Sequence, residues 1–180
     1  MITNFFLTGR PRRGKSTIIA RFLPLIQGPA GGFFVQRLLM GGETRAFRLV
    51  DLLEEPYHLQ QPLTGRISNL LIYQKKNSPH WTPVVSTFNL VGVRALQRAA
   101  HCPLLIMDEL GIFEEKAVPF QKAVLDRLRS PQTVLGVLKN KQGRFLNNIR
   151  ARDDLEIHRV DDPETENRLE FFLQQRGLLK

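Results

Sequence analysis

The sequence of 180 residues contains one cysteine and one tryptophan, and it has no long hydrophobic run. A single cysteine, Cys102, excludes an internal disulfide and any metal site built from two cysteines. Because Cys102 flanks an apolar segment, we expect a small buried hydrophobic residue rather than a reactive thiol. No stretch approaches the length of a membrane-spanning helix, and the apolar run near the N-terminus is too short for a signal peptide. We therefore expect a cytoplasmic protein without a membrane partner.

Acidic residues are scarce relative to basic ones. The chain has 17 Asp and Glu against 26 Lys and Arg, which gives a net charge of +9. Residues 1–90 carry 11 basic and 4 acidic side chains, whereas residues 91–180 carry 15 and 13. A basic field attracts polyanions, whether nucleotides or nucleic acids. Since neither an aromatic RNA-binding signature nor a zinc-knuckle spacing accompanies it, a solvated basic surface is favoured over nucleic-acid binding.

Length and patterning predict one α/β domain that spans residues 1–180. Apolar strand-like segments alternate with amphipathic helical ones, an order typical of three layers in which helices flank a mostly parallel central sheet. Strands are expected over residues 3–7, 31–37, 44–50, 67–76, 104–107, 133–138 and 155–159, the last at an edge. Helices are expected over 15–23, 88–100, 118–128 and 144–152, with a final one from Asp162 as N-cap and Pro163 to Gly177.

The segments between the expected strands and helices contain fewer recognisable sequence patterns. Gly41 and Gly42 predict a hairpin, residues 52–66 are expected to be irregular, and Asn77-Ser78-Pro79 predicts a turn. In a sheet of this kind, ligands bind at the carboxyl ends of the strands.

A phosphate-binding loop is the most informative motif. Its residues are Gly9, Arg10, Pro11, Arg12, Arg13, Gly14, Lys15, Ser16 and Thr17. Glycines let the backbone curl around a polyphosphate, and the amides and the following helix N-terminus provide donors and a positive dipole end. Lys15 reaches the β and γ phosphates, and the Ser16 hydroxyl is a ligand for Mg²⁺. Arg12 and Arg13 add positive charge but restrict the backbone at positions where small residues are common.

A second acidic motif follows the apolar run of residues 104–107. Asp108 is expected to hold Mg²⁺ opposite Ser16, and Glu109 to orient or deprotonate the attacking water. The alternative is a helix cap at Asp108 with a solvated Glu109, which the upstream loop makes the weaker interpretation.

A basic side chain should stabilise charge on the γ-phosphate, and the sequence offers several. Each of them is individually more typical of a solvated charge: Arg12, Arg13, Arg94, Lys139 and Lys141. Three further side chains could contact a base or form a lid, but a role in the core or in anchoring a loop is favoured for each: His80, Trp81 and Phe88.

Over nearly its whole length the chain resembles the thermophile-type nucleoside-triphosphatase family, also called the cancer-related nucleoside-triphosphatase family. The family usually has glycine at the position of Arg12, and a basic-glycine-aromatic segment near residues 84–89, where this chain reads Val-Val-Ser-Thr-Phe-Asn. The resemblance rests on the phosphate loop with Ser16-Thr17, Gly31-Gly32-Phe33-Phe34, Gly41-Gly42, Phe47, residues 104–107 with Asp108-Glu109-Leu110-Gly111, Phe120, residues 134–137 and residues 145–149.

The resemblance implies a variation of the RecA-type P-loop fold and hydrolysis of ATP, GTP and other nucleoside triphosphates with Mg²⁺. It also implies that Gly9 to Thr17 bind the nucleotide, with Lys15 and Glu109 as catalytic residues and Asp108 on the metal side. Three alternatives stay open: a small-molecule kinase that acts on a nucleoside or nucleotide, a slow nucleotide-dependent regulatory module, and an RNA- or DNA-binding protein.

Overall fold

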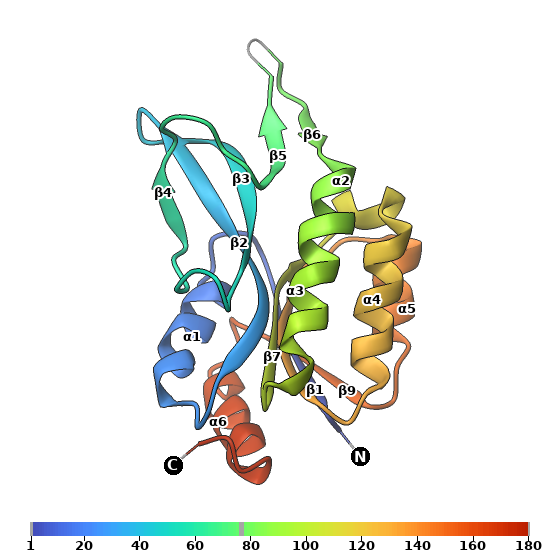
Figure 1. Cartoon of the computed structure of the whole chain (residues 1–180). Coiled ribbons are helices and arrows are strands. Elements are labelled where there is room, and N and C mark those ends of the chain that lie inside the picture. Colours follow the sequence, from blue (N-terminus) through green and yellow to red (C-terminus); the bar gives the residue numbers. More distant parts are fainter. Residues whose placement is uncertain (1, 76–77, 180) are drawn as a thin grey trace.

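The computed structural model describes residues 2–75 and 78–179. Within them, a nine-stranded sheet runs through the molecule with helices on both of its faces (Figure 1). In the main path the strand order is β6-β5-β3-β2-β7-β8-β1-β9, and β4 pairs separately with β2. The strands are β1 (Asn4–Thr8), β2 (Ala30–Met40), β3 (Glu43–Asp51), β4 (Gln60–Pro62), β5 (Leu70–Gln74), β6 (Trp81–Pro83), β7 (Leu104–Leu110), β8 (Thr133–Leu138) and β9 (Leu155–Arg159).

The helices divide between the two faces. Figure 1 shows α1 and α6 on one side of the sheet and α3, α4 and α5 on the other. Among the described residues, none of these helices is both long and apolar enough to cross a membrane. The helices and helical turns are α1 (Lys15–Phe22), η1 (Leu23–Leu25), α2 (Val85–Thr87), η2 (Phe88–Gly92), α3 (Val93–Arg98), η3 (Ala99–His101), η4 (Phe113–Lys116), α4 (Val118–Arg129), α5 (Arg144–Arg150) and α6 (Thr165–Gln175).

The sheet is parallel through β2, β7, β8, β1 and β9, and antiparallel through β3, β5 and β6. This confirms the expected three-layer α/β fold with a mostly parallel centre. Because the carboxyl ends of parallel strands meet at one edge of a sheet, the segments after β1, β7 and β8 lie next to one another. That edge holds both motifs identified in the sequence.

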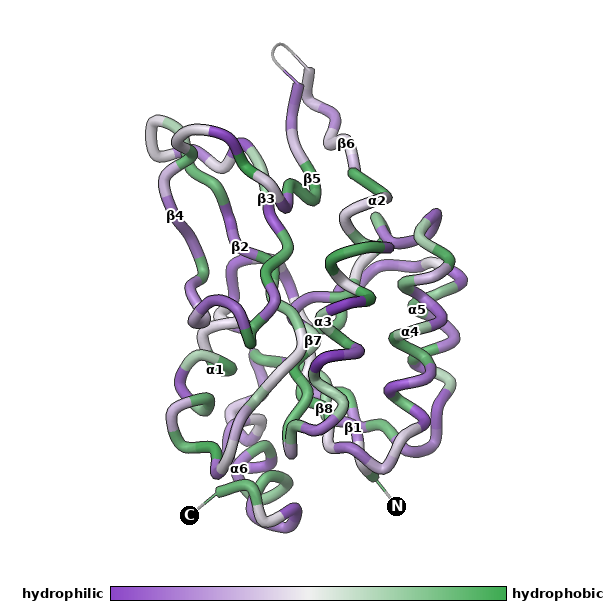
Figure 2. The backbone as a smooth tube through the Cα atoms, viewed as in Figure 1, coloured by the Kyte–Doolittle hydropathy of each residue, from purple (hydrophilic) through white to green (hydrophobic). Residues whose placement is uncertain are grey.

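Two buried clusters fill the space between the layers. Strand β7 alternates between them: Leu105 and Met107 face the cluster under α3, α4 and α5, and Leu104 and Ile106 face the cluster under α1 and α6. A strand covered on both faces has no polar side, which explains its uninterrupted apolar sequence. In Figure 2 the central strands are mainly green, whereas α4 alternates between green and purple. Cys102 lies in the first cluster and is 8% exposed, as predicted.

Gly32 explains part of the Gly-Gly-Phe-Phe element. Its φ is +107°, and a Cβ atom there would lie 2.1 Å from the carbonyl oxygen of Ile106. Only glycine allows β2 to approach β7 this closely. The following Phe33 and Phe34 are then buried on opposite faces of the sheet, Phe33 against Phe120 and Phe34 against Tyr57.

Several boundaries differ from the predictions. Residues 52–66 are not wholly irregular, because β4 pairs in parallel with β2, and β6 was not expected. The last helix begins at Thr165 rather than at Pro163. Asp162 instead forms a turn, in which its carboxylate accepts the Glu164 N–H and its carbonyl accepts the Thr165 N–H. Gly177 ends this helix at φ +66°, as predicted. Asn77, in the predicted turn, and Lys76, at the end of the predicted strand, lie outside the described residues.

Candidate functional site

The predicted phosphate-binding loop, residues 9–17, connects β1 to α1 and contains three residues with positive φ. Gly9 has φ +135°, Gly14 has φ +88°, and Arg12 has φ +60°. Arg12 is the only residue other than glycine with positive φ in the described part of the chain. The left-handed conformation costs an L-residue about 1–2 kcal/mol. The backbone at Arg12 therefore favours glycine, the residue that the family usually has at this position.

Lys15 is the buried cation of this loop. Lys15 is the first residue of α1 and is only 8% exposed. The Nζ atom donates hydrogen bonds to the carbonyl oxygens of Gly9, at 3.2 Å, and Arg10, at 2.8 Å. Burial lowers the pKa of Lys15, and the carboxylates of Glu109 and Asp108 oppose this shift. The ammonium group therefore lies within the electrostatic reach of both acids.

Ser16 and Asp108 meet as expected. The Ser16 hydroxyl donates to Oδ1 of Asp108 across 3.0 Å, which joins the loop to the end of β7. The hydroxyl of Tyr57 donates to the other carboxylate oxygen, Oδ2. Burial raises the pKa of Asp108 to about 7, although the hydrogen bonds from Tyr57 and Ser16 lower it. Both oxygens of this buried acid are thus held in fixed directions.

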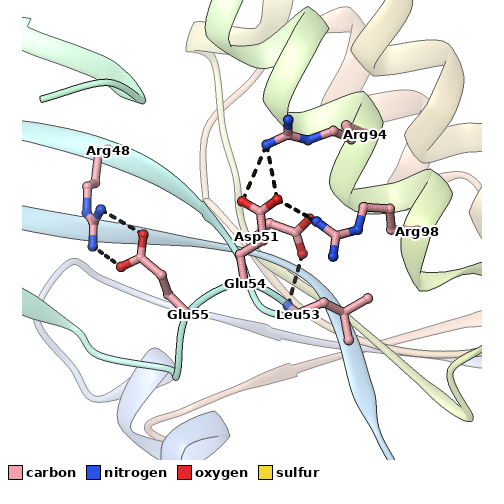
Figure 3. A network of polar contacts seen from close by, with 7 residues as sticks. All are labelled: Arg48, Asp51, Leu53, Glu54, Glu55, Arg94 and Arg98. Atoms are coloured by element: carbon pink, nitrogen blue, oxygen red, sulfur yellow. Dashed lines mark hydrogen bonds and ion pairs between the residues drawn. The ribbon is translucent and has the colours of Figure 1, made fainter.

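Tyr57 was not predicted, because it lies in the segment that the sequence presents as irregular. Its ring packs against Phe34, with the centroids 4.8 Å apart. Ion pairs between Arg48 and Glu55 at 2.5 Å, and between Arg98 and Asp51 at 3.1 Å, anchor the loop that carries it. Figure 3 shows this network, which also includes Glu54 and Arg94.

Glu109 follows Asp108 in β7, and the peptide bond between them is cis. Oε1 of Glu109 lies 2.6 Å from Nζ of Lys139, which comes directly after β8. The same Nζ lies 5.7 Å from the centroid of the Phe113 ring. Lys139 is therefore the one candidate basic residue that the described structure pairs with Glu109.

The other candidates do not pair with Glu109 in the described structure. Arg94 pairs with Glu54 at 3.3 Å, and Arg12, Arg13 and Lys141 have exposed side chains. Trp81 packs against Phe47, with ring centroids 5.2 Å apart. Of the other two side chains considered for a base contact or a lid, Phe88 is buried in the core and His80 is exposed.

The donor set at Ser16 and Asp108 fits Mg²⁺. A hydroxyl and a carboxylate are hard oxygen ligands, and Mg²⁺ is commonly held by one or two protein ligands together with substrate phosphates. No group of three or more His, Cys, Asp and Glu side chains able to hold a metal is found among residues 2–75 and 78–179. Two oxygen ligands from the protein suit an ion that takes its remaining ligands from a phosphate substrate and water.

The sequence matches one family model, whose description is NTPase, over residues 4–172. It is 30% identical to the nucleoside-triphosphatase THEP1 of Thermofilum pendens over 167 residues, which cover 87% of this chain and 86% of that protein. It is 28% identical to the cancer-related nucleoside-triphosphatase homolog of Bos taurus, with 89% of each chain covered.

Solved structures resemble the fold. The crystal structure of THEP1 from Aquifex aeolicus aligns with a TM-score of 0.71 at 18% identity, covering 96% of this chain and 98% of that one. The solution structure of a human cancer-related nucleoside triphosphatase aligns with a TM-score of 0.65 at 21% identity and 97% coverage of both chains. Their whole length therefore shares this arrangement of sheet and helices.

Proposed function

The chain belongs to the NTPase family and is a nucleoside-triphosphatase, and we propose that it hydrolyses ATP, GTP and other nucleoside triphosphates with Mg²⁺ through residues Gly9–Thr17, Asp108 and Glu109. The observation that carries this assignment is the 3.0 Å contact between Ser16 and Asp108. It joins the phosphate loop to the acidic strand end, so that a metal ion beside Asp108 would lie next to a triphosphate bound in the loop.

The loop and Lys15 bind the triphosphate. Backbone amides from Gly9 to Thr17 and the N-terminus of α1 supply donors to the phosphate oxygens. When a phosphate enters, Lys15 exchanges its bonds to the Gly9 and Arg10 carbonyls for phosphate oxygens. Because burial has already removed much of its water, the ammonium group interacts strongly with the incoming charge.

Ser16 and Asp108 hold the metal side of the site. An Mg²⁺ ion held by these two residues would offset the negative charge that develops on the phosphate oxygens. Tyr57 keeps Oδ2 of Asp108 engaged, so that Oδ1, which accepts the Ser16 hydroxyl, is the oxygen left to hold the ion beside Ser16. The protein thereby fixes the direction of the metal-binding oxygens before substrate binds.

Glu109 acts on the attacking water. Its carboxylate orients the water toward the γ-phosphorus and takes up a proton as the new bond forms. Lys139, 2.6 Å from Glu109, fixes the direction of the carboxylate and places a positive charge beside the transferred phosphoryl group. This assigns to Lys139 the role for which the sequence offered several candidates.

The test is phosphate release from ATP, GTP, CTP and UTP with and without Mg²⁺, together with nucleotide binding by a fluorescent analogue. Glu109→Gln should keep nucleotide affinity and lose roughly 10²-fold or more of the phosphate release. Glu170→Gln, the same change at an exposed position of α6, is the matched control and should resemble the unmodified protein. Unchanged hydrolysis in Glu109→Gln would remove Glu109 from the mechanism. Tight binding without turnover in the unmodified protein would favour the regulatory alternative.

A further inference from the structure

A cavity of about 190 Å³ opens beside Glu109 and Lys139. Its lining comes from strands β2, β3, β5 and β6, from the end of β7 and the turn η4, and from Lys139 after β8. Its volume exceeds the ~30 Å³ share of a water molecule several-fold. Because the cavity is partly open to solvent, it can enclose the flat ring of a ligand whose remaining atoms lie outside it. Attack by water alone does not require such a space.

Three aromatic side chains line the cavity. Phe47 and Trp81 pack against each other at an interplanar angle of 56°, and both line the cavity. Phe113 also lines the cavity, with the Lys139 ammonium group over its ring. Aromatic walls bind flat rings through stacked and edge-to-face contacts. The lining therefore fits a planar molecule better than a branched aliphatic one.

One polar atom in this lining has no partner. Glu114 is 4% exposed and lines the cavity, and its Oε1 accepts the N–H of Gly111 at 3.1 Å. Its Oε2 is buried and makes no hydrogen bond. An unsatisfied buried polar atom costs about 1–3 kcal/mol, so a ligand with a complementary polar group would gain by pairing with it. A heteroaromatic ring with nitrogen or amino substituents has such a group.

The cavity and the phosphate loop share Glu109. This residue lines the cavity, and its charge also acts on Lys15 in the loop. Because Lys15 serves the β and γ phosphates, the cavity lies at the γ-phosphate end of the bound triphosphate. A hydroxyl group on a ligand in the cavity could occupy the place of the attacking water.

We propose that this cavity binds a second substrate, a nucleoside-sized alcohol with a flat heteroaromatic ring, whose hydroxyl accepts the γ-phosphoryl group. The proposal rests on the nucleotide site described above. The hydroxyl oxygen forms a new bond to the γ-phosphorus, and the bond from this phosphorus to the β–γ bridging oxygen breaks. The hydroxyl proton passes to the Glu109 carboxylate. The products are a phosphate monoester and the nucleoside diphosphate, and hydrolysis is the same reaction with water as acceptor.

The only tryptophan of the chain, Trp81, reports on this cavity. The unmodified protein is mixed with adenosine, guanosine, cytidine or uridine in the presence of a non-hydrolysable triphosphate and Mg²⁺, and Trp81 fluorescence is recorded. In parallel, ATP labelled at the γ-phosphate is supplied, and the products are separated. We expect at least one nucleoside to change the fluorescence saturably and to take up label as its monophosphate. If no nucleoside does both, the proposal is overturned.

Two matched substitutions locate the effect. Val35 lines the cavity and Val91 does not, and both are partly buried valines against the same core cluster. Val35→Phe fills the cavity and should weaken nucleoside binding and label transfer roughly tenfold or more, with phosphate release in the absence of nucleoside within about twofold of the unmodified protein. Val91→Phe should retain both nucleoside binding and label transfer.

Equal label transfer in Val35→Phe and the unmodified protein overturns the proposal. Phosphate release without any nucleoside effect overturns this inference alone, whereas absence of phosphate release overturns the hydrolase assignment itself.

Discussion

Replacing Glu114 by Gln should change how the stability of the protein depends on pH. Burial raises the pKa of Glu114 from 4.5 to about 7, even though its hydrogen bonds to backbone N–H groups lower it. The folded protein therefore binds this proton more tightly than the unfolded chain does. Between pH 4.5 and 7 the folded state carries more protons, so the free energy of unfolding falls as pH rises through this window.

The size of the effect follows from the pKa. A shift from 4.5 to about 7 corresponds to roughly 3 kcal/mol of stability, which is present at low pH and lost above pH 7. Glutamine has nearly the same shape, stays neutral, and can still accept the Gly111 N–H. The Glu114→Gln variant should match the unmodified protein near pH 4.5 and become more stable than it by about 3 kcal/mol near pH 8.

The measurement is urea unfolding of both proteins at several pH values between about 4.5 and 8. Asp108 also has a raised pKa of about 7, but it is present in both proteins, so the difference between them isolates Glu114. Glu115→Gln, at the exposed neighbouring position, is the matched control for the substitution itself. A stability difference between Glu114→Gln and the unmodified protein that stays constant with pH would refute the reasoning.

Two further predictions concern the nucleotide site. Arg12→Gly should be about 1 kcal/mol more stable in urea unfolding than Arg12→Ala, because both remove the charge but only glycine accepts φ +60° without strain; equal stability would show that the loop relaxes. Tyr57→Phe should lower the free energy of unfolding by about 1.5–3 kcal/mol near pH 8, where Asp108 is ionised and loses a donor, and by less near pH 5. A loss that does not depend on pH would contradict the hydrogen bond to the ionised carboxylate.

Patterns that depend on neighbouring residues could be predicted from the sequence. The phosphate loop, the buried β7 and the glycine at the end of α6 each follow from local backbone preferences or from burial on two faces. The convergence of Ser16 with Asp108 also followed, because parallel strands bring their carboxyl ends to one edge.

Features set by distant contacts could not be predicted. Tyr57 reaches Asp108 because ion pairs with β3 and α3 hold its loop. No local sequence pattern predicts such pairs. Lys139 was one of several equivalent basic residues until the end of β8 placed it beside Glu109. The start of α6 was misplaced because Asp162 can form a turn as readily as a helix cap.

The position of β1 in the sheet has a consequence for how the protein is made. Asn4 at the start of β1 lies opposite Val134 of β8 and Leu155 of β9, and β1 has no other strand partner in the described structure. During synthesis β1 therefore waits for its partners until β8 and β9 have been made. Pairings this distant in sequence fold slowly and leave apolar strands exposed in the meantime. Nascent chains that stop before β8 should consequently bind chaperones and fail to bind nucleotide, although they already contain the whole phosphate loop.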